Sequence, residues 1–197
     1  EHITSATRTL ASVVDTMVCS ASSLAPTYTN KPTTMSRKYE GKITPKTTIA
    51  LVVHMSGAPV NVLALRDVAR KHGLFVLEDC AQCAAGSIGG RKVGTFGDIG
   101  IYSFQMNKNM TAGEGGCVVT NDLALYRRAV ACHDLGYPRS DEGRLQFNIP
   151  ELCLWGMGYR MDELRASVLR VQLRKLPRVT AAMRRSKYRV RAALEYP

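Results

Sequence analysis

The sequence predicts an α/β fold with a mostly parallel sheet flanked by helices. Two short apolar runs, residues 48–54 and 74–77, enclose a segment of helical pattern, and further apolar runs follow at 99–104 and 117–120. Short apolar runs of this kind are typical of strands buried on both faces. The order strand, helix, strand predicts a right-handed crossover that makes the first two strands parallel.

The first helix is indicated by spacing and by its end. Val62, Leu65, Val68 and Ala69 recur at intervals of one, three and four residues, and Gly73 stands where the residue after a helix end belongs. Later, the glycine-rich residues 113–116 predict a tight turn between two strands. Residues 122–132 and 162–194 have helical patterns, and we expect Pro177 to interrupt the second.

Three regions follow from these patterns. Residues 1–45 contain 15 Ser or Thr and predict no firm element, so we expect a poorly defined N-terminal segment there. Residues 46–160 form the α/β core, and residues 161–197 form a basic helical segment. The chain starts at Glu1 rather than Met and stops directly after a helical pattern, so we expect a fragment.

Composition excludes several classes of protein. The 197 residues are 45% hydrophobic, which is too apolar for a disordered chain, and no apolar run reaches the length of a membrane span. Six Cys spread along the chain favour reduced thiols and a cytoplasmic location. Cys80 and Cys83 form a CxxC pair, but no second pair exists, so we predict no metal site.

The charge is concentrated at the C-terminal end. Of the net charge of +11, residues 157–197 contribute most, with 11 Lys or Arg against three acidic residues. A basic helix of this kind can bind nucleic acid. Here the arginines interleave with apolar residues such as Leu169, Leu173 and Leu176, as on the solvated face of a packed helix. We therefore expect no nucleic-acid partner.

Two positions could carry chemistry. Asp79 follows an apolar strand, and ligands of parallel sheets bind beyond the carboxyl ends of strands, although Asp there could equally cap a helix. Lys108 lies between a strand and the glycine-rich turn, with Ser103 upstream. Pyridoxal phosphate chemistry uses such a set, because a Lys binds the cofactor aldehyde as a Schiff base and a carboxylate pairs with the ring nitrogen.

The central motifs resemble a known family. Similarity to the DegT/DnrJ/EryC1/StrS family of sugar and cyclitol aminotransferases is close at residues 77–86, 90–98, 102–104, 107–109, 113–116 and 118–122. Weaker similarity at 43–57, 159–164 and 171–176 extends it over about three quarters of the chain. The resemblance implies the large domain of a fold type I enzyme dependent on pyridoxal 5′-phosphate, incomplete at both ends.

The resemblance also implies roles for individual residues. Lys108 is the Schiff-base lysine, Asp79 pairs with the pyridine nitrogen, Gln82 contacts the ring or its phenolic oxygen, and Ser103 holds the phosphate. The implied reaction moves an amino group from an amino acid donor to a keto sugar, nucleotide-linked, or to a keto-cyclitol. Such enzymes serve sugar and antibiotic biosynthesis, and the implied assembly is a homodimer.

Three departures from the family favour an alternative. Residues 1–45 contain no Gly-Thr or Gly-Ser turn for the phosphate, and Gly158 stands where the family has an Asn. We also expect the small domain of the family to be absent after Pro197. The alternative is a truncated, non-catalytic homologue that acts as an interaction subunit.

Overall fold

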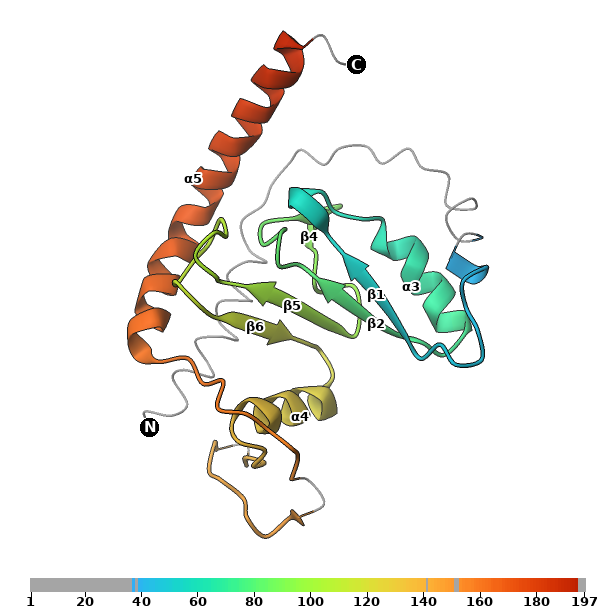
Figure 1. Cartoon of the computed structure of the whole chain (residues 1–197), viewed down its shortest axis with the longest axis vertical. Coiled ribbons are helices and arrows are strands. Elements are labelled where there is room, and N and C mark those ends of the chain that lie inside the picture. The colour runs from blue at the N-terminus through green and yellow to red at the C-terminus, as the bar shows by residue number, and fades with distance from the viewer. Residues whose placement is uncertain (1–36, 38, 141, 151–152, 195–197) are drawn as a thin grey trace.

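A four-stranded sheet organises the part of the chain that the computed structural model describes, namely residues 37, 39–140, 142–150 and 153–194. Its strands are β1 (Ile49–Val53), β2 (Phe75–Asp79), β5 (Ile99–Ser103) and β6 (Gly116–Val119). Their order is β1-β2-β5-β6 (Figure 1). β2 pairs parallel with both β1 and β5, and β6 pairs antiparallel with β5. The prediction of an α/β fold with a mostly parallel sheet is confirmed.

Three helices accompany the sheet. They are α3 (Val62–Lys71), α4 (Leu123–His133) and α5 (Glu163–Ala193). Each begins after a side chain that accepts a backbone N–H of the first turn: Asn61 from Ala64, Asp122 from Leu125 and Asp162 from Arg165. Such caps satisfy N–H groups that have no partner inside the helix. A one-turn helix η1 (Met55–Gly57) and the hairpin β3 (Ser87–Ile88) and β4 (Arg91–Lys92) complete the described elements.

The end of α3 explains how the chain returns to the sheet. Gly73 has φ of +65°, a conformation that glycine adopts without steric cost. Its N–H donates to the carbonyl of Arg70, and the N–H of Leu74 donates to that of Ala69. This pair of bonds is a Schellman motif, which ends the helix and directs the chain into β2.

One face of the sheet is covered, and we call it the closed face. Val76 packs there with Val62 and Ala69 of α3 and with Phe96. A second cluster on the same face joins Tyr102 and Val119 of the sheet to α5 and to residues 80–93; its members include Cys80, Cys83, Val93, Phe104, Met110, Leu169 and Leu176. These two clusters form the core of the described residues.

The opposite face is open among the described residues, and we call it the open face. Leu51 is 58% exposed there and Phe75 is 55% exposed. Ile49, Val53 and Val118 are also exposed. The prediction that residues 48–54 form a strand is confirmed, but burial of that strand on both faces is wrong. The reason is that α3 packs on the closed face only, and the open face is left exposed on β1 and on the interior strand β2 alike.

α5 runs without a break through Pro177, so the expected interruption there is wrong (Figure 1). Pro177 lacks the N–H that would bond to the carbonyl of Leu173, but its fixed φ is compatible with a helix and its side chain is exposed. Leu169 and Leu176 anchor the first half of α5 in the core. Residues 181–194 are all exposed.

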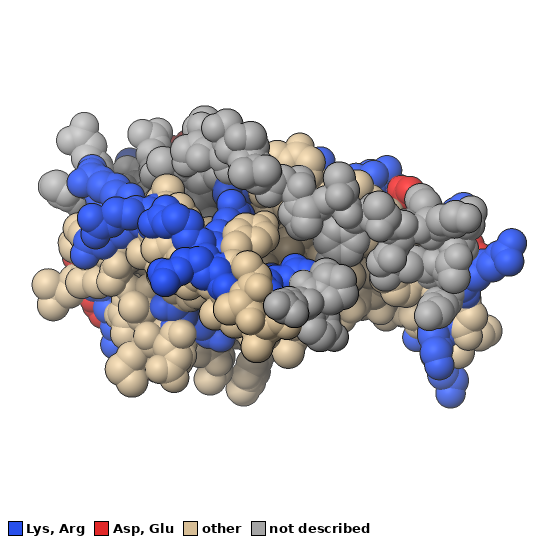
Figure 2. All heavy atoms as spheres, turned by 90° about the horizontal axis from the view of Figure 1, so that it is seen from above, with Lys and Arg blue, Asp and Glu red and all other residues tan. Residues whose placement is uncertain are grey.

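The cations of α5 are exposed, as the interleaved sequence pattern predicts. Figure 2 shows Lys and Arg side chains gathered toward one end of the molecule, over α5. At the start of this helix, Arg165 forms an ion pair with the capping residue Asp162 at 3.4 Å. None of the described helices is both long and apolar enough to cross a bilayer.

The predicted region boundaries stay a prediction. Residues 1–36 and 38, which make up most of the predicted N-terminal segment, lie outside the described residues.

Candidate functional site

Asp79 is the last residue of β2, and its side chain belongs to the open face. It pairs in register with Val53 of β1 and Ile101 of β5, which share that face. Asp79 Oδ1 accepts the N–H of Ala81 at 2.9 Å and so closes a local turn. Because no described helix begins at this point, the helix-cap interpretation fails. A half-buried carboxylate therefore stands at the carboxyl end of a parallel strand, where ligands bind in such sheets.

Ser103 is the last residue of β5 and lies on the same face as Asp79, because residues 101 and 103 alternate with the buried Tyr102. Its hydroxyl accepts the N–H of Gln105 at 3.3 Å. Lys108 follows five residues later in the loop between β5 and β6, and its side chain is half-buried. Its Nζ has no hydrogen bond or ion pair with a described residue.

Gln82 lies three residues beyond β2 and is tied to the loop that follows β1. Its Oε1 accepts the N–H of Ser56 at 3.0 Å, and its carbonyl accepts the N–H of Gly57 at 2.9 Å. The side-chain oxygen is therefore occupied. The Nε2 group of Gln82 is the part that could donate a hydrogen bond to a ligand.

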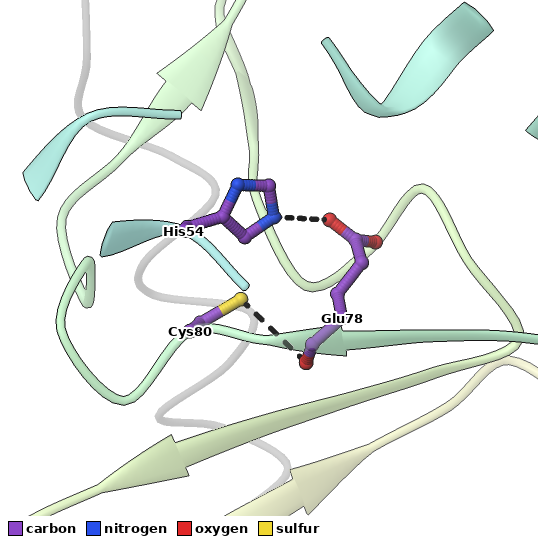
Figure 3. Close-up of side chains that lie close together, drawn as sticks. All are labelled: His54, Glu78 and Cys80. Atoms are coloured by element: carbon purple, nitrogen blue, oxygen red, sulfur yellow. Dashed lines mark hydrogen bonds and ion pairs between the residues drawn. The ribbon is translucent and has the colours of Figure 1, made fainter. Parts of the chain in front are cut away.

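His54 and Glu78 form a buried pair on the closed face (Figure 3), and Glu78 immediately precedes Asp79 in β2. His54 Nε2 lies 3.0 Å from Glu78 Oε2. Sequence reasoning placed His54 at a strand end, which is confirmed, but missed that it pairs with Glu78. The alternation of side chains along a strand could have indicated it. Glu78 lies two residues after the core residue Val76, so both side chains point to the closed face and the acidic residue is buried there.

Glu78 is ionised although it is buried. Burial raises its pKa, but hydrogen bonds from His54 and from the N–H groups of Gly94, Gly97 and Phe96 outweigh burial and lower its pKa below the ordinary value. The backbone bonds are 2.6 to 2.7 Å long. The carboxylate thus binds four donors and holds the turn at residues 94–97 against β2.

His54, Glu78 and Cys80 have potential metal-ligating atoms within 4.8 Å of one another. Both ring nitrogens of His54 and both oxygens of Glu78 already have hydrogen-bond partners. Burial raises the pKa of the Cys80 thiol, which disfavours the thiolate that a metal binds. The cluster therefore fits a structural hydrogen-bond centre better than a metal site.

The open-face residues fit a different ligand. Asp79 offers a carboxylate and Ser103 a hydroxyl at one edge of the sheet, and Lys108 offers an amine in the loop that leaves this edge. A carboxylate, a hydroxyl and an unpaired amine are the groups that bind the ring nitrogen, phosphate and aldehyde of pyridoxal phosphate. The residue types and their placement fit this cofactor.

Comparisons with known proteins agree with this chemistry. Residues 6–195 match the DegT/DnrJ/EryC1/StrS aminotransferase family. The chain is 40% identical over 150 residues to the L-glutamine:2-deoxy-scyllo-inosose aminotransferase of Streptoalloteichus tenebrarius, which covers 75% of this chain and 35% of that protein. It is 36% identical over 148 residues to the UDP-N-acetyl-3-dehydro-alpha-D-glucosamine 3-aminotransferase of Acidithiobacillus ferrooxidans, with 75% and 38% covered.

A solved structure shares the fold. The aminotransferase of Psychrobacter cryohalolentis superposes with a TM-score of 0.64 at 35% identity, over 72% of this chain and 37% of that one. This chain thus spans little more than a third of the length of these proteins. The three relatives described above are aminotransferases, and the family depends on pyridoxal phosphate. The chain therefore belongs to the DegT/DnrJ/EryC1/StrS aminotransferase family.

Proposed function

We propose that this chain forms the cofactor-binding part of an aminotransferase that moves an amino group from an amino acid to a keto sugar or keto-cyclitol. The observation that carries the proposal is that Asp79 and Ser103 share one face at one edge of the sheet, with Lys108 in the adjoining loop. Pyridoxal phosphate, when bound, supplies an electrophilic aldehyde and a ring that accepts electrons from the substrate.

Each of the four site residues has a proposed role toward the cofactor. Lys108 Nζ would hold the cofactor through its aldehyde and, as a free amine, would accept and donate the proton that the reaction moves. Asp79 keeps the ring nitrogen protonated, which strengthens electron withdrawal. Ser103 donates its hydroxyl to the phosphate, and Gln82 donates through Nε2 because Ser56 occupies its Oε1.

The substrates are proposed by class. One relative is named for L-glutamine and a keto-cyclitol, and another for a nucleotide-linked 3-keto sugar. We therefore propose glutamine or glutamate as donor and a keto sugar, nucleotide-linked, or a keto-cyclitol as acceptor. We also propose that the protein is a cytoplasmic homodimer. Sedimentation equilibrium would measure the mass of the assembly.

Borohydride reduction tests the cofactor site. The protein is incubated with pyridoxal phosphate, reduced, digested and mapped by mass spectrometry beside a Lys108→Ala variant. We expect one pyridoxyl group on Lys108, lost in the variant. Lys46, an exposed lysine outside the site, gives a matched Lys46→Ala control that keeps the adduct.

The opposite result has a definite meaning. Adducts spread over surface lysines, and unchanged by Lys108→Ala, would overturn the enzyme proposal. That outcome would favour the non-catalytic homologue. Gly158 supports this alternative, because it offers no side chain where the family resemblance expects an Asn.

A further inference from the structure

The buried His54–Glu78 pair is connected by backbone and side-chain bonds to two residues of the proposed cofactor site. Glu78 immediately precedes Asp79 in β2, and the N–H of His54 donates to the carbonyl of Asp79 at 2.9 Å. Figure 3 shows His54 and Glu78 side by side, and both are completely buried. Asp79 is the next residue of the strand after Glu78, so its side chain belongs to the opposite, open face. The pair is thus behind the site and touches no ligand position.

The bonds of His54 fix its tautomer. The N–H of Val60 donates to Nδ1 of His54 at 3.0 Å, so Nδ1 carries a lone pair and not a proton. The ring proton is therefore on Nε2, which donates to Glu78 Oε2. One imidazole ring thereby connects the loop after β1 to the carboxylate in β2.

Glu78 turns this connection into a rigid support. Its Oε1 accepts the N–H groups of Phe96 and Gly97, and its Oε2 accepts those of Gly94 and His54. Both oxygens are fully used and the side chain is completely buried. Because interiors of this kind transmit displacement, the end of β2 moves only together with the turn at residues 94–97 and with His54.

The loop after β1 connects the pair to Gln82. Ser56 in this loop has φ of +50°, which residues other than glycine seldom adopt, so neighbouring bonds must hold it there. Its N–H donates to Gln82 Oε1, and the Val60 to His54 bond fixes the far end of the same loop. The orientation of the Gln82 side chain therefore depends on His54.

We propose that His54 and Glu78 are positioning residues that set the places of Asp79 and Gln82 at the cofactor site. This inference rests on the proposed function. Glu78 fixes the end of β2 and with it the carboxylate of Asp79. His54 Nδ1 fixes the loop that orients Gln82, so one ring serves both contacts through its two nitrogens.

A first experiment needs no cofactor. The N–H of Ala81 bonds to Asp79 and the N–H of Ser56 bonds to Gln82, so these two amide protons report on the site in nuclear magnetic resonance spectra. Glu78→Gln places an NH2 group against backbone N–H donors. We expect the Ala81 amide proton to shift upfield and to exchange faster with solvent in this variant.

Tyr102→Phe is the matched control. The buried Tyr102 hydroxyl donates to the carbonyl of Val93, beside the turn that Glu78 holds, so its loss also removes a buried hydrogen bond. It has no bond to Glu78 or Asp79. We expect the Ala81 and Ser56 amide protons to keep their shifts. Equal changes in both variants would reduce Glu78 to a general stabilising residue and overturn the proposal.

Two further variants test the contacts of the two His54 nitrogens separately. They also test the proposal if Glu78→Gln fails to fold. His54→Asn keeps an acceptor near the Nδ1 position, and His54→Gln keeps a donor near the Nε2 position. We expect His54→Asn to move the Ala81 amide proton and His54→Gln to move the Ser56 amide proton. Folded variants in which neither proton moves would overturn the proposal.

A second experiment measures pyridoxal phosphate binding. Glu78→Gln should weaken it by roughly 10- to 100-fold, by analogy with the loss found when a residue that orients a metal ligand is removed. Tyr102→Phe should leave it unchanged. If the unmodified protein binds pyridoxal phosphate but forms no adduct on Lys108, the proposed function is refuted. The shifts of the Ala81 and Ser56 amide protons would still test the positioning role. Unchanged affinity in Glu78→Gln would overturn that role.

Discussion

A carboxylate on the closed face of the sheet and a carboxylate on the open face differ in burial and in hydrogen bonding. Glu78 and Asp79 are consecutive carboxylates in β2, yet Glu78 is completely buried with four donors and Asp79 is half-buried with one. Full occupation makes Glu78 a structural anion. Partial occupation leaves Asp79 able to bind a ligand. Successive side chains of a strand point to opposite faces of the sheet. Glu78 therefore stabilises the fold on the closed face, whereas its neighbour Asp79 can bind a ligand on the open face.

The aromatic residues repeat this contrast. Phe104 is 1% exposed in the cluster beneath α5, whereas Phe75 is 55% exposed on the open face. The apolar residues of the closed face thus contribute burial to folding. Those of the open face contribute little among the described residues.

The largest expected effect comes from truncating the closed face. Phe104→Ala should lower the free energy of unfolding by about 3–5 kcal/mol, because it removes a buried ring and leaves a cavity. Phe75→Ala is the matched control and should lower it by less than about 1 kcal/mol. Urea denaturation followed by circular dichroism measures both values. Equal losses would show that the open face is covered and would remove the contrast.

A smaller effect concerns acid. The pKa of Glu78 lies below its ordinary value of 4.5 in the folded protein, because the bonds from His54 and three backbone N–H groups outweigh burial. The unfolded state therefore binds a proton first as pH falls, so the stability that Glu78 supplies is complete above about pH 4.5 and is lost through the lower folded pKa.

The measurement is the free energy of unfolding against pH. We expect the unmodified protein to lose more stability than Glu78→Gln as the pH falls below 4.5, because the variant has no carboxylate to protonate at this position. Parallel curves for the two proteins would contradict an ionised Glu78 on the closed face.

The smallest expected effect on stability is on the open face. Asp79→Asn should change the free energy of unfolding by less than about 0.5 kcal/mol, because Asn keeps an oxygen for the N–H of Ala81. Pyridoxal phosphate binding should nevertheless weaken, since Asn cannot supply the negative charge that the proposed role of Asp79 requires. Thermal unfolding and a binding titration measure the two effects. A large loss of stability with unchanged binding would assign Asp79 to the structural class of Glu78.

The sequence predicted most elements because their signals are local. Asp122 and Asp162 cap helices at the expected starts, and Gly73 ends α3 as its position indicated. The prediction that Pro177 interrupts α5 was wrong because a local pattern does not include tertiary packing. The penalty of the proline is local, whereas the anchoring of α5 by Leu169 and Leu176 is tertiary and outweighs it.

The sequence by itself determined the α/β class, the strands and the residue types at the site, because apolar period, capping residues and motif spacing are properties of the linear chain. Lys108, Asp79, Gln82 and Ser103 were all identified at that level and stay predictions in their roles. Only the tertiary structure decided which face of β1 is exposed and that His54 and Glu78, 24 residues apart, form one buried pair. The physical reason is that burial and long-range hydrogen bonds depend on which elements pack together, and no local pattern specifies that.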